Sequence, residues 1–121
     1  MKLAIIGSRA ITSFDARIIL KYIPKETTAI LSGGAKGVDA FAEEIAANRG
    51  LPFVQILPDY LRYGRKAPII RNREIVRQAD YVLAVWDFKS RGTAHAIACC
   101  IKEGVPVRIL SANLPPARQP R

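Results

Sequence analysis

The stretch SGGAKGVD, residues 32–39, decides how this chain folds. It follows a short apolar run, residues 28–31, that predicts a β-strand, and it leads into an amphipathic run, residues 38–49, that predicts a helix. A glycine-rich turn between a strand and a helix presents backbone N–H groups to an anion, and glycine lets a ligand approach the backbone closely. The turn therefore predicts either a phosphate site with Lys36 as a mobile positive charge or a tight turn with that lysine in solvent.

Two common phosphate-binding motifs do not match this turn. The Walker motif requires serine or threonine after its Gly-Lys pair, whereas Lys36 is followed by Gly37. The dinucleotide fingerprint G-x-G-x-x-G requires a spacing that Gly33, Gly34 and Gly37 do not have. The turn thus points to a phosphate or nucleotide site that belongs to neither a standard kinase nor a standard dehydrogenase.

The composition predicts one globular domain with an anionic partner. The chain has 121 residues, of which 50% are hydrophobic, and its net charge is +9. No apolar run approaches the roughly 20 residues that span a membrane, and the apolar start is too short for a signal peptide. We therefore expect a cytoplasmic protein without a membrane partner. Its positive charge favours a nucleotide, a nucleic acid or an acidic protein surface, or else serves solubility alone.

The two cysteines, Cys99 and Cys100, are adjacent in the chain. Neighbouring residues on a helix point in different directions, which disfavours a disulfide between them. The chain has one histidine and no CxxC pair, so the sequence predicts no metal site. We interpret the two cysteines as small packing residues.

Strands alternate with helices along the chain, which indicates right-handed βαβ units. Apolar runs predict further strands at residues 2–6, 53–57, 81–86 and 105–110. Helices are predicted from Thr12 or Ser13 to Pro24, over 38–49, from Pro68 to about Ala79, and from Gly92 to Gly104. Residues 59–67 lack periodicity and predict a basic loop.

This alternation predicts an α/β fold: a Rossmann-like doubly wound sheet of about five mostly parallel strands in the order 3-2-1-4-5. The domain spans residues 1–110, and residues 111–121, rich in proline and arginine, predict a disordered tail. The predicted inner face of the second helix is Val38, Phe41, Ala42, Ile45 and Ala46. That of the last helix is Ala94, Ile97, Ala98 and Ile101.

A ligand site is expected at one edge of this sheet. In doubly wound sheets the ligand binds beyond the carboxyl ends of the strands, where the strand order reverses. Here the reversal falls between the first and fourth strands. The turns that begin at Gly7 and Ser32, together with residues 87–93, are therefore expected to open onto one crevice.

Several segments, taken in order, resemble the SLOG superfamily. They are Gly7-Ser8-Arg9, residues 32–39, Arg71-Asn72-Arg73 and Ser90-Arg91-Gly92-Thr93. The superfamily includes the Rossmann-like core of the DNA-processing protein DprA (Smf) and the LOG phosphoribohydrolases, and this chain most resembles single-domain YspA-related members. The resemblance runs from Lys2 to about Leu110. It implies a pocket for a nucleotide or nucleotide derivative. Together with Arg9 and Lys36, the three turns at one edge favour a sensor or binding module, and we expect no cofactor.

The resemblance assigns ligand binding to residues in each matching segment. They are Gly7, Ser8, Arg9, Ser32, Gly33, Gly34, Ala35, Lys36, Asp39, Arg71, Asn72, Gly92 and Thr93. For several of them a second interpretation stays open. Arg9 and Lys36 either bind phosphate or are solvated, and Thr93 either donates to phosphate or caps its helix. Asp39 either satisfies the N-terminus of its helix or holds a sugar hydroxyl or Arg9.

The resemblance to the LOG enzymes is incomplete where catalysis is concerned. Those enzymes carry a Pro-Gly-Gly-x-Gly-Thr-x-x-Glu signature whose glutamate serves N-glycosidic cleavage. Here Ser90-Arg91-Gly92-Thr93 matches it in part, and Ala96 occupies the glutamate position. Without that carboxylate the general acid–base step has no obvious agent, so a phosphoribohydrolase is the least favoured alternative.

A basic segment, residues 62–73, supports DprA-like single-stranded DNA binding as the other alternative. Its cations can contact a nucleic-acid backbone, and Tyr60 and Tyr63 can stack on bases. The segment can equally act as a lid or lie in solvent.

Three further features leave alternatives open. Trp86 either stacks on a base or packs in the core, and His95 is a weak acid–base candidate. Apolar surface on the helices that carry Cys99 and Ile69 would suit a homodimer.

Overall fold

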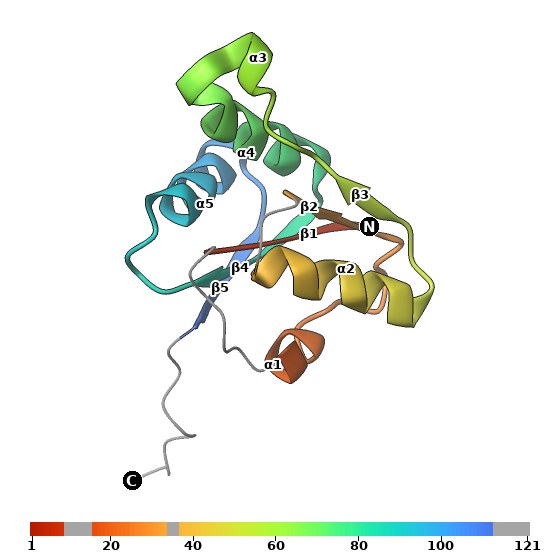
Figure 1. Ribbon diagram of the computed structural model, residues 1–121. Coiled ribbons are helices and arrows are strands. Elements are labelled where there is room, and N and C mark those ends of the chain that lie inside the picture. Colours follow the sequence, from red (N-terminus) through yellow and green to blue (C-terminus); the bar gives the residue numbers. More distant parts are fainter. Residues whose placement is uncertain (9–15, 34–36, 113–121) are drawn as a thin grey trace, which may run out of the picture.

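A five-stranded parallel sheet in the order β3-β2-β1-β4-β5 forms the centre of the molecule (Figure 1). The structure, a computed structural model, describes residues 1–8, 16–33 and 37–112. The strands are β1 (Lys2–Gly7), β2 (Ala29–Ser32), β3 (Phe53–Gln55), β4 (Tyr81–Trp86) and β5 (Val107–Ser111). All of the strand pairs are parallel, and Leu3 of β1 lies opposite both Ile30 of β2 and Tyr81 of β4. The predicted fold class and strand order are confirmed.

Helices cover both faces of the sheet. They are α1 (Ala16–Leu20), α2 (Val38–Arg49), α3 (Tyr60–Tyr63), the 3-10 helix η1 (Gly64–Lys66), α4 (Ala67–Gln78) and α5 (Arg91–Glu103). In Figure 1, α1 and α2 lie against one face, and α4 and α5 lie side by side against the other. None of the helices within the described ranges is long and apolar enough to cross a membrane.

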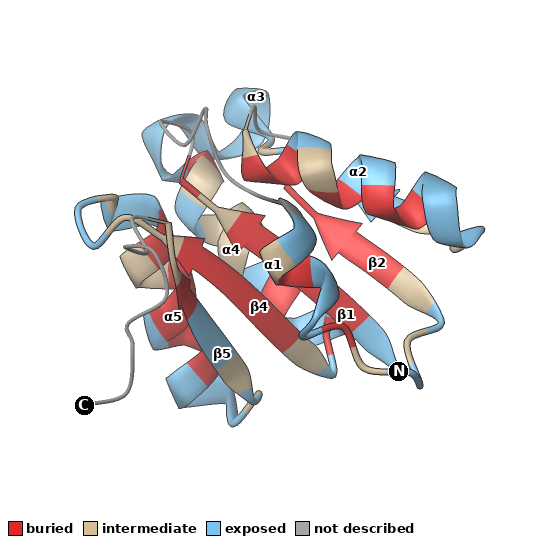
Figure 2. Ribbon diagram, turned by 90° about the horizontal axis from the view of Figure 1, so that it is seen from below, coloured by how far each residue is buried: buried red, intermediate tan, exposed pale blue. Residues whose placement is uncertain are grey.

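Strand β1 is buried on both of its faces. Leu3 and Ile5 pack into the core cluster beneath α1 and α2, whereas Ala4 and Ile6 pack into the cluster beneath α4 and α5. Figure 2 shows the same pattern, with buried strands at the centre and exposed outer faces on the helices. Because both faces exclude water, the strand reads as a continuous apolar run in the sequence. Each fully buried leucine or isoleucine contributes roughly 1.5–3 kcal/mol to folding.

Helix α2 has the bounds and the inner face that its periodicity predicts. Its buried apolar residues are Val38, Ala42, Ile45 and Ala46, and Phe41 is half-buried. The helix ends at Gly50, whose φ of 64° is left-handed and whose N–H bonds to the last carbonyls of the helix.

The predicted inner face of α5 is wrong for Ala98 and Ile101. The buried residues of α5 are Thr93, Ala96, Ile97, Cys99 and Cys100, and Ile101 is 74% exposed. Because α5 packs against α4 as well as against the sheet, its buried side includes the small residues Ala96, Cys99 and Cys100. The cysteines are packing residues, as predicted, and burial, with a smaller effect from Cys99, raises the pKa of the Cys100 thiol to about 11.

Residues 59–67, predicted to be a loop, instead form α3, η1 and the start of α4. The Asp59 carboxylate accepts a hydrogen bond from the Arg62 N–H at 3.1 Å, which caps the first turn. Gly64, with a φ of 59°, ends α3 and donates its N–H to the Tyr60 carbonyl. This turn is held by local hydrogen bonds and has no buried face, so hydrophobic periodicity gives no sign of it.

Several predicted boundaries also differ. The third strand stops at Gln55, the fifth runs over Val107–Ser111, and α1 ends at Leu20, before Pro24. The predicted caps Thr12 and Ser13, and the tail from residue 113 on, lie outside the described residues. Ile69 and Ile101 are exposed on α4 and α5, whereas Cys99 is buried, and a homodimer stays a prediction.

The substitution Gly7→Ala tests how closely β1 approaches α2. A Cβ atom on Gly7 would lie 2.5 Å from Cβ and Cγ2 of Val38, so strand or helix must shift. Overpacking of this kind costs about 1–3 kcal/mol, and we expect urea unfolding to show that loss. Gly92→Ala is the matched control, because its Cβ would meet nothing within 4 Å and alanine is favoured in helix α5. Equal losses in both variants would contradict the close approach.

Candidate functional site

A cavity of about 400 Å³ lies at the carboxyl ends of the strands, where the strand order reverses. Several residues predicted to bind ligand line it together: Gly7, Gly33, Asp39, Arg71, Asn72, Gly92 and Thr93. Of the other predicted residues, Ser8 and Ser32 are buried and hydrogen-bonded to members of this set. Arg9, Gly34, Ala35 and Lys36 lie outside the described residues, so their roles stay predictions.

Asp39 is a buried carboxylate in the wall of the cavity. Its Oδ1 accepts a hydrogen bond from Ser32 Oγ at 2.7 Å, and both residues are buried. Ser32 ends β2 and Asp39 lies in the first turn of α2, where the positive end of the helix dipole favours a negative charge. Both roles predicted for Asp39, at the N-terminus of α2 and in contact with a sugar hydroxyl or Arg9, stay predictions, whereas its hydrogen bond from Ser32 is present in the structure.

Arg71 and Asn72 of α4 connect two walls of the cavity. Arg71 Nη1 donates to the Gly33 carbonyl at 2.7 Å, and Arg71 Nε donates to Asn72 Oδ1 at 3.0 Å. Asn72 Nδ2 then donates to the Gly92 carbonyl at 3.2 Å. Consecutive side chains on one helix therefore fix both the turn after β2 and the first turn of α5. A Cβ on Gly33 would lie 2.7 Å from Arg71 Nη1, which explains why glycine suits that turn.

Asp87, which the sequence analysis missed, organises the turn after β4. Its Oδ1 accepts the N–H groups of Ser90 at 2.8 Å and Lys89 at 2.9 Å, and the hydroxyl of Ser8 at 3.3 Å. Hydrogen bonds from those two backbone N–H groups hold the pKa of Asp87 below its usual value. Ser90 in turn caps α5 by accepting the Thr93 N–H. An aspartate three residues before a helix-capping serine is the local signal of this turn.

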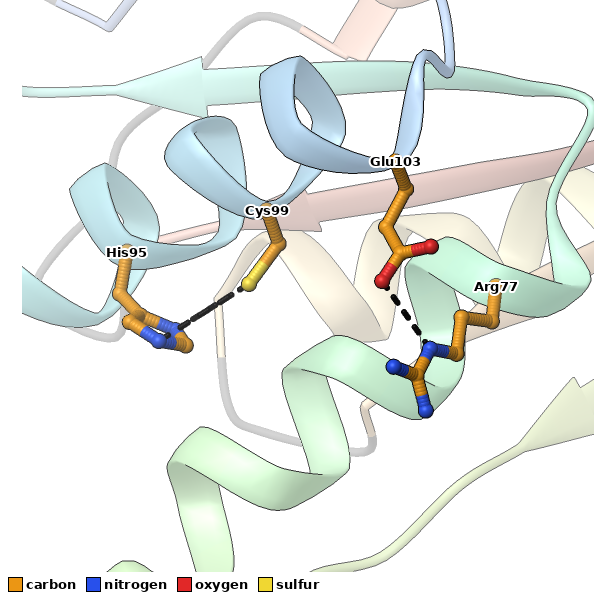
Figure 3. A network of polar contacts seen from close by, with 4 residues as sticks. All are labelled: Arg77, His95, Cys99 and Glu103. Carbon is orange, nitrogen blue, oxygen red and sulfur yellow. Dashed lines mark hydrogen bonds and ion pairs between the residues drawn. The ribbon is translucent and has the colours of Figure 1, made fainter.

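Two aromatic candidates from the sequence do not line the cavity. His95 lies beside Cys99 on the same helix, with Nδ1 3.7 Å from Sγ (Figure 3). Trp86 donates its indole N–H to the Ser90 carbonyl at 3.0 Å and packs against the core, which agrees with the packing interpretation. Figure 3 also shows the ion pair between Arg77 and Glu103, 3.0 Å apart, which joins the last turns of α4 and α5.

Acidic side chains are scarce among the described residues of the cavity wall. Ala96, at the position of the LOG glutamate, is buried and lines the cavity. Asp39 is the only acidic side chain among the described residues that line it, and it already accepts a hydrogen bond from Ser32. Within the described ranges, no group of three or more histidine, cysteine or acidic residues is placed to hold a metal ion.

The sequence profile of the DNA recombination-mediator protein A family matches residues 1–67, a little more than half of the chain. This chain belongs to that family. Gene 61 protein of Mycobacterium phage D29 is 34% identical over 84 residues, which cover 64% of this chain and 67% of that protein. The family assignment fits the resemblance to the SLOG superfamily, and closeness to its YspA-related members stays a prediction.

A solved structure of DNA processing protein A from Helicobacter pylori has the same fold as this member of the DNA recombination-mediator protein A family. The two superpose with a TM-score of 0.65 at 23% sequence identity. The match covers 90% of this chain and 64% of the Helicobacter chain, so the present chain spans less than two thirds of that relative.

The substitution Asp87→Ala tests the hydrogen bonds that the Asp87 carboxylate accepts at the start of α5. We expect a lower free energy of unfolding at pH 7, because the turn loses its common acceptor. The folded-state pKa of Asp87 lies below its usual 3.8, so its contribution is complete above that pH and is lost as the pH falls below it. Urea unfolding should show the gap between wild type and variant narrowing below about pH 4. A gap that stays constant down to about pH 2.5 would contradict the role of the carboxylate.

Proposed function

We propose that this domain binds single-stranded DNA and that the cavity receives one nucleotide of the strand. The observation that carries the proposal is the convergence of Arg71 and the first turn of α5 on one cavity at the strand ends. Membership of the DNA recombination-mediator protein A family and the net charge of +9 support DNA as the source of that nucleotide. The Helicobacter protein of the same fold is described for its mode of binding single-stranded DNA.

The phosphate of this nucleotide binds most favourably beside Arg71 and the N-terminus of α5. A guanidinium forms charge-assisted hydrogen bonds with phosphate, and the N-terminus of a helix carries about half a positive charge. Gly92, without a side chain, lets a phosphate approach the backbone, and Thr93 adds a hydroxyl. The carboxylate of Asp39 repels phosphate but accepts N–H or O–H donors, so the base or the sugar suits that wall.

A free nucleotide or nucleotide derivative is the second candidate ligand, with the domain acting as a sensor or binding module. The volume of about 400 Å³ favours it, because small-molecule sites fall in the range of about 300–1,000 Å³. The phosphoribohydrolase alternative lacks such support, since Ala96 leaves the wall without the signature carboxylate.

The central test is binding of a fluorescently labelled 20-nucleotide oligo(dT), followed by anisotropy. We expect binding that weakens steeply with added salt, because counterions are released from the strand. Arg71→Ala should weaken binding about 10- to 100-fold, the range expected for lost charge-assisted hydrogen bonds. Arg49→Ala is the matched control, since it removes the same charge from an exposed position in the last turn of α2, far from Asp39 in the first turn. Equal losses in both variants, or no binding at low salt, would contradict the proposal.

A competition experiment separates the two candidate ligands. If the strand is the ligand, thymidine monophosphate should displace oligo(dT) only at concentrations far above those of the oligonucleotide. If a free nucleotide is the ligand, one mononucleotide class should raise the melting temperature at micromolar concentration, because a ligand that binds only the native state stabilises it. A mononucleotide that binds as tightly as the oligonucleotide would favour the sensor.

A further inference from the structure

The segment of residues 59–66, which contains α3 and η1 and is called here the α3–η1 rim, exposes large apolar side chains beside the cavity. Tyr60 is 56% exposed and lines the cavity, and so does Leu57, which is 61% exposed just before the rim. Leu61 is fully exposed. No residue of α3 or η1 is buried, and Figure 2 shows α3 exposed throughout. Apolar surface gathered at the mouth of a cavity in this way marks an interaction site.

Local hydrogen bonds hold the rim in shape. The Asp59 carboxylate accepts the Arg62 N–H at 3.1 Å, and the Asp59 carbonyl accepts the Tyr63 N–H at 3.0 Å. Gly64 closes the turn onto Tyr60, and α4 begins directly after η1 with the buried Ala67. The ring of Tyr60 is therefore presented from a fixed turn, which lowers the entropy lost when a flat partner stacks on it.

The charges of the rim identify the partner as a polyanion. Arg62, Arg65 and Lys66 are exposed, and the one acidic residue of the rim, Asp59, is engaged in the helix cap. The Arg62 guanidinium lies 5.2 Å from the centre of the Tyr63 ring. Cations interleaved with aromatic rings match a single strand, whose phosphates need the cations and whose unpaired bases need the rings. A second copy of this chain would bring two basic rims together and repel.

We infer that the α3–η1 rim is a stacking platform for bases that flank the nucleotide in the cavity. This inference rests on the proposed binding of single-stranded DNA, and it adds that the rim selects unpaired bases. Tyr60, at the boundary between rim and cavity, stacks on the first flanking base, and the cations follow the phosphates. Every base has an aromatic face, so the platform tolerates any sequence but requires that the bases are unpaired. Duplex DNA cannot stack on the rim in this way, because its bases are paired and stack on one another.

The test compares two 12-nucleotide strands with the same number of phosphates. One is oligo(dT), and the other keeps a single central thymine among abasic nucleotides. Wild type should bind oligo(dT) about 5- to 100-fold more tightly, the range expected for base–aromatic stacking. Tyr60→Ala should remove most of that difference by weakening the binding of oligo(dT) much more than the binding of the abasic strand. Tyr60→Phe should restore it, because the ring stacks and the hydroxyl does not.

The matched control is Tyr22→Ala. Tyr22 is about as exposed as Tyr63 and has the Arg108 guanidinium 4.8 Å from its ring centre, but it follows α1 on the opposite face of the sheet from α4. It should leave both strands unaffected, and melting temperatures should show that all variants fold.

The outcomes that overturn the inference differ from those that overturn the proposed function. If wild type binds both strands equally, or if Tyr60→Ala weakens both equally, the rim does not stack bases, although DNA binding stands. If wild type binds neither strand, the proposed function fails and the stacking inference fails with it. If Tyr60→Ala instead abolishes a dimer seen by analytical ultracentrifugation and leaves DNA binding unchanged, the rim belongs to a second copy.

Discussion

Burial of β1 on both faces is the constraint on which the site depends. Because Leu3 and Ile5 face one helical layer and Ala4 and Ile6 face the other, a shift of one residue would reverse both sets. The register with β2 and β4 is therefore fixed, and with it the point after Gly7 where the chain leaves the sheet. Every parallel strand then ends at the same edge, and the helices that follow begin there. The cavity is the consequence of that shared edge.

A few polar side chains convert this edge into a site. Arg71 reaches the Gly33 carbonyl across 38 residues of sequence, and Asp87 reaches Ser8 across 79. These bonds tie the turns after β1, β2 and β4 to α4 and to the start of α5. Helix α4 is continuous with the α3–η1 rim, so the surface proposed for base stacking and the arginine proposed for phosphate lie on one unbroken stretch of chain. In the proposed complex, contact at the rim would therefore position the strand over the cavity.

The sequence predicted the parts of the structure that hydrophobic burial determines. The bounds of α2 and β4 followed from their apolar residues. The alternation of strands and helices predicted the strand order, and that order predicted the meeting of Gly7, Gly33 and Gly92 at one cavity. The α3–η1 rim was missed because Asp59 and Gly64 hold it without an apolar face. The exposure of Ile101 was missed because contact with α4 changes which side of α5 is buried. Bonds such as that from Ser8 to Asp87 join residues that no local pattern connects.

The charge distribution argues for a strand over a free nucleotide. A free nucleotide ends inside the cavity, where Arg71 can meet its phosphate, whereas exposed cations also extend beyond the cavity along Arg62, Arg65 and Lys66. Cations outside a cavity gain nothing from a ligand that ends inside it, but they meet the neighbouring phosphates of a polymer. Salt screens those contacts strongly and base stacking only weakly. Binding that keeps its preference for bases at high salt would therefore come from the rings at the mouth, while binding that salt removes would come from the cations around them.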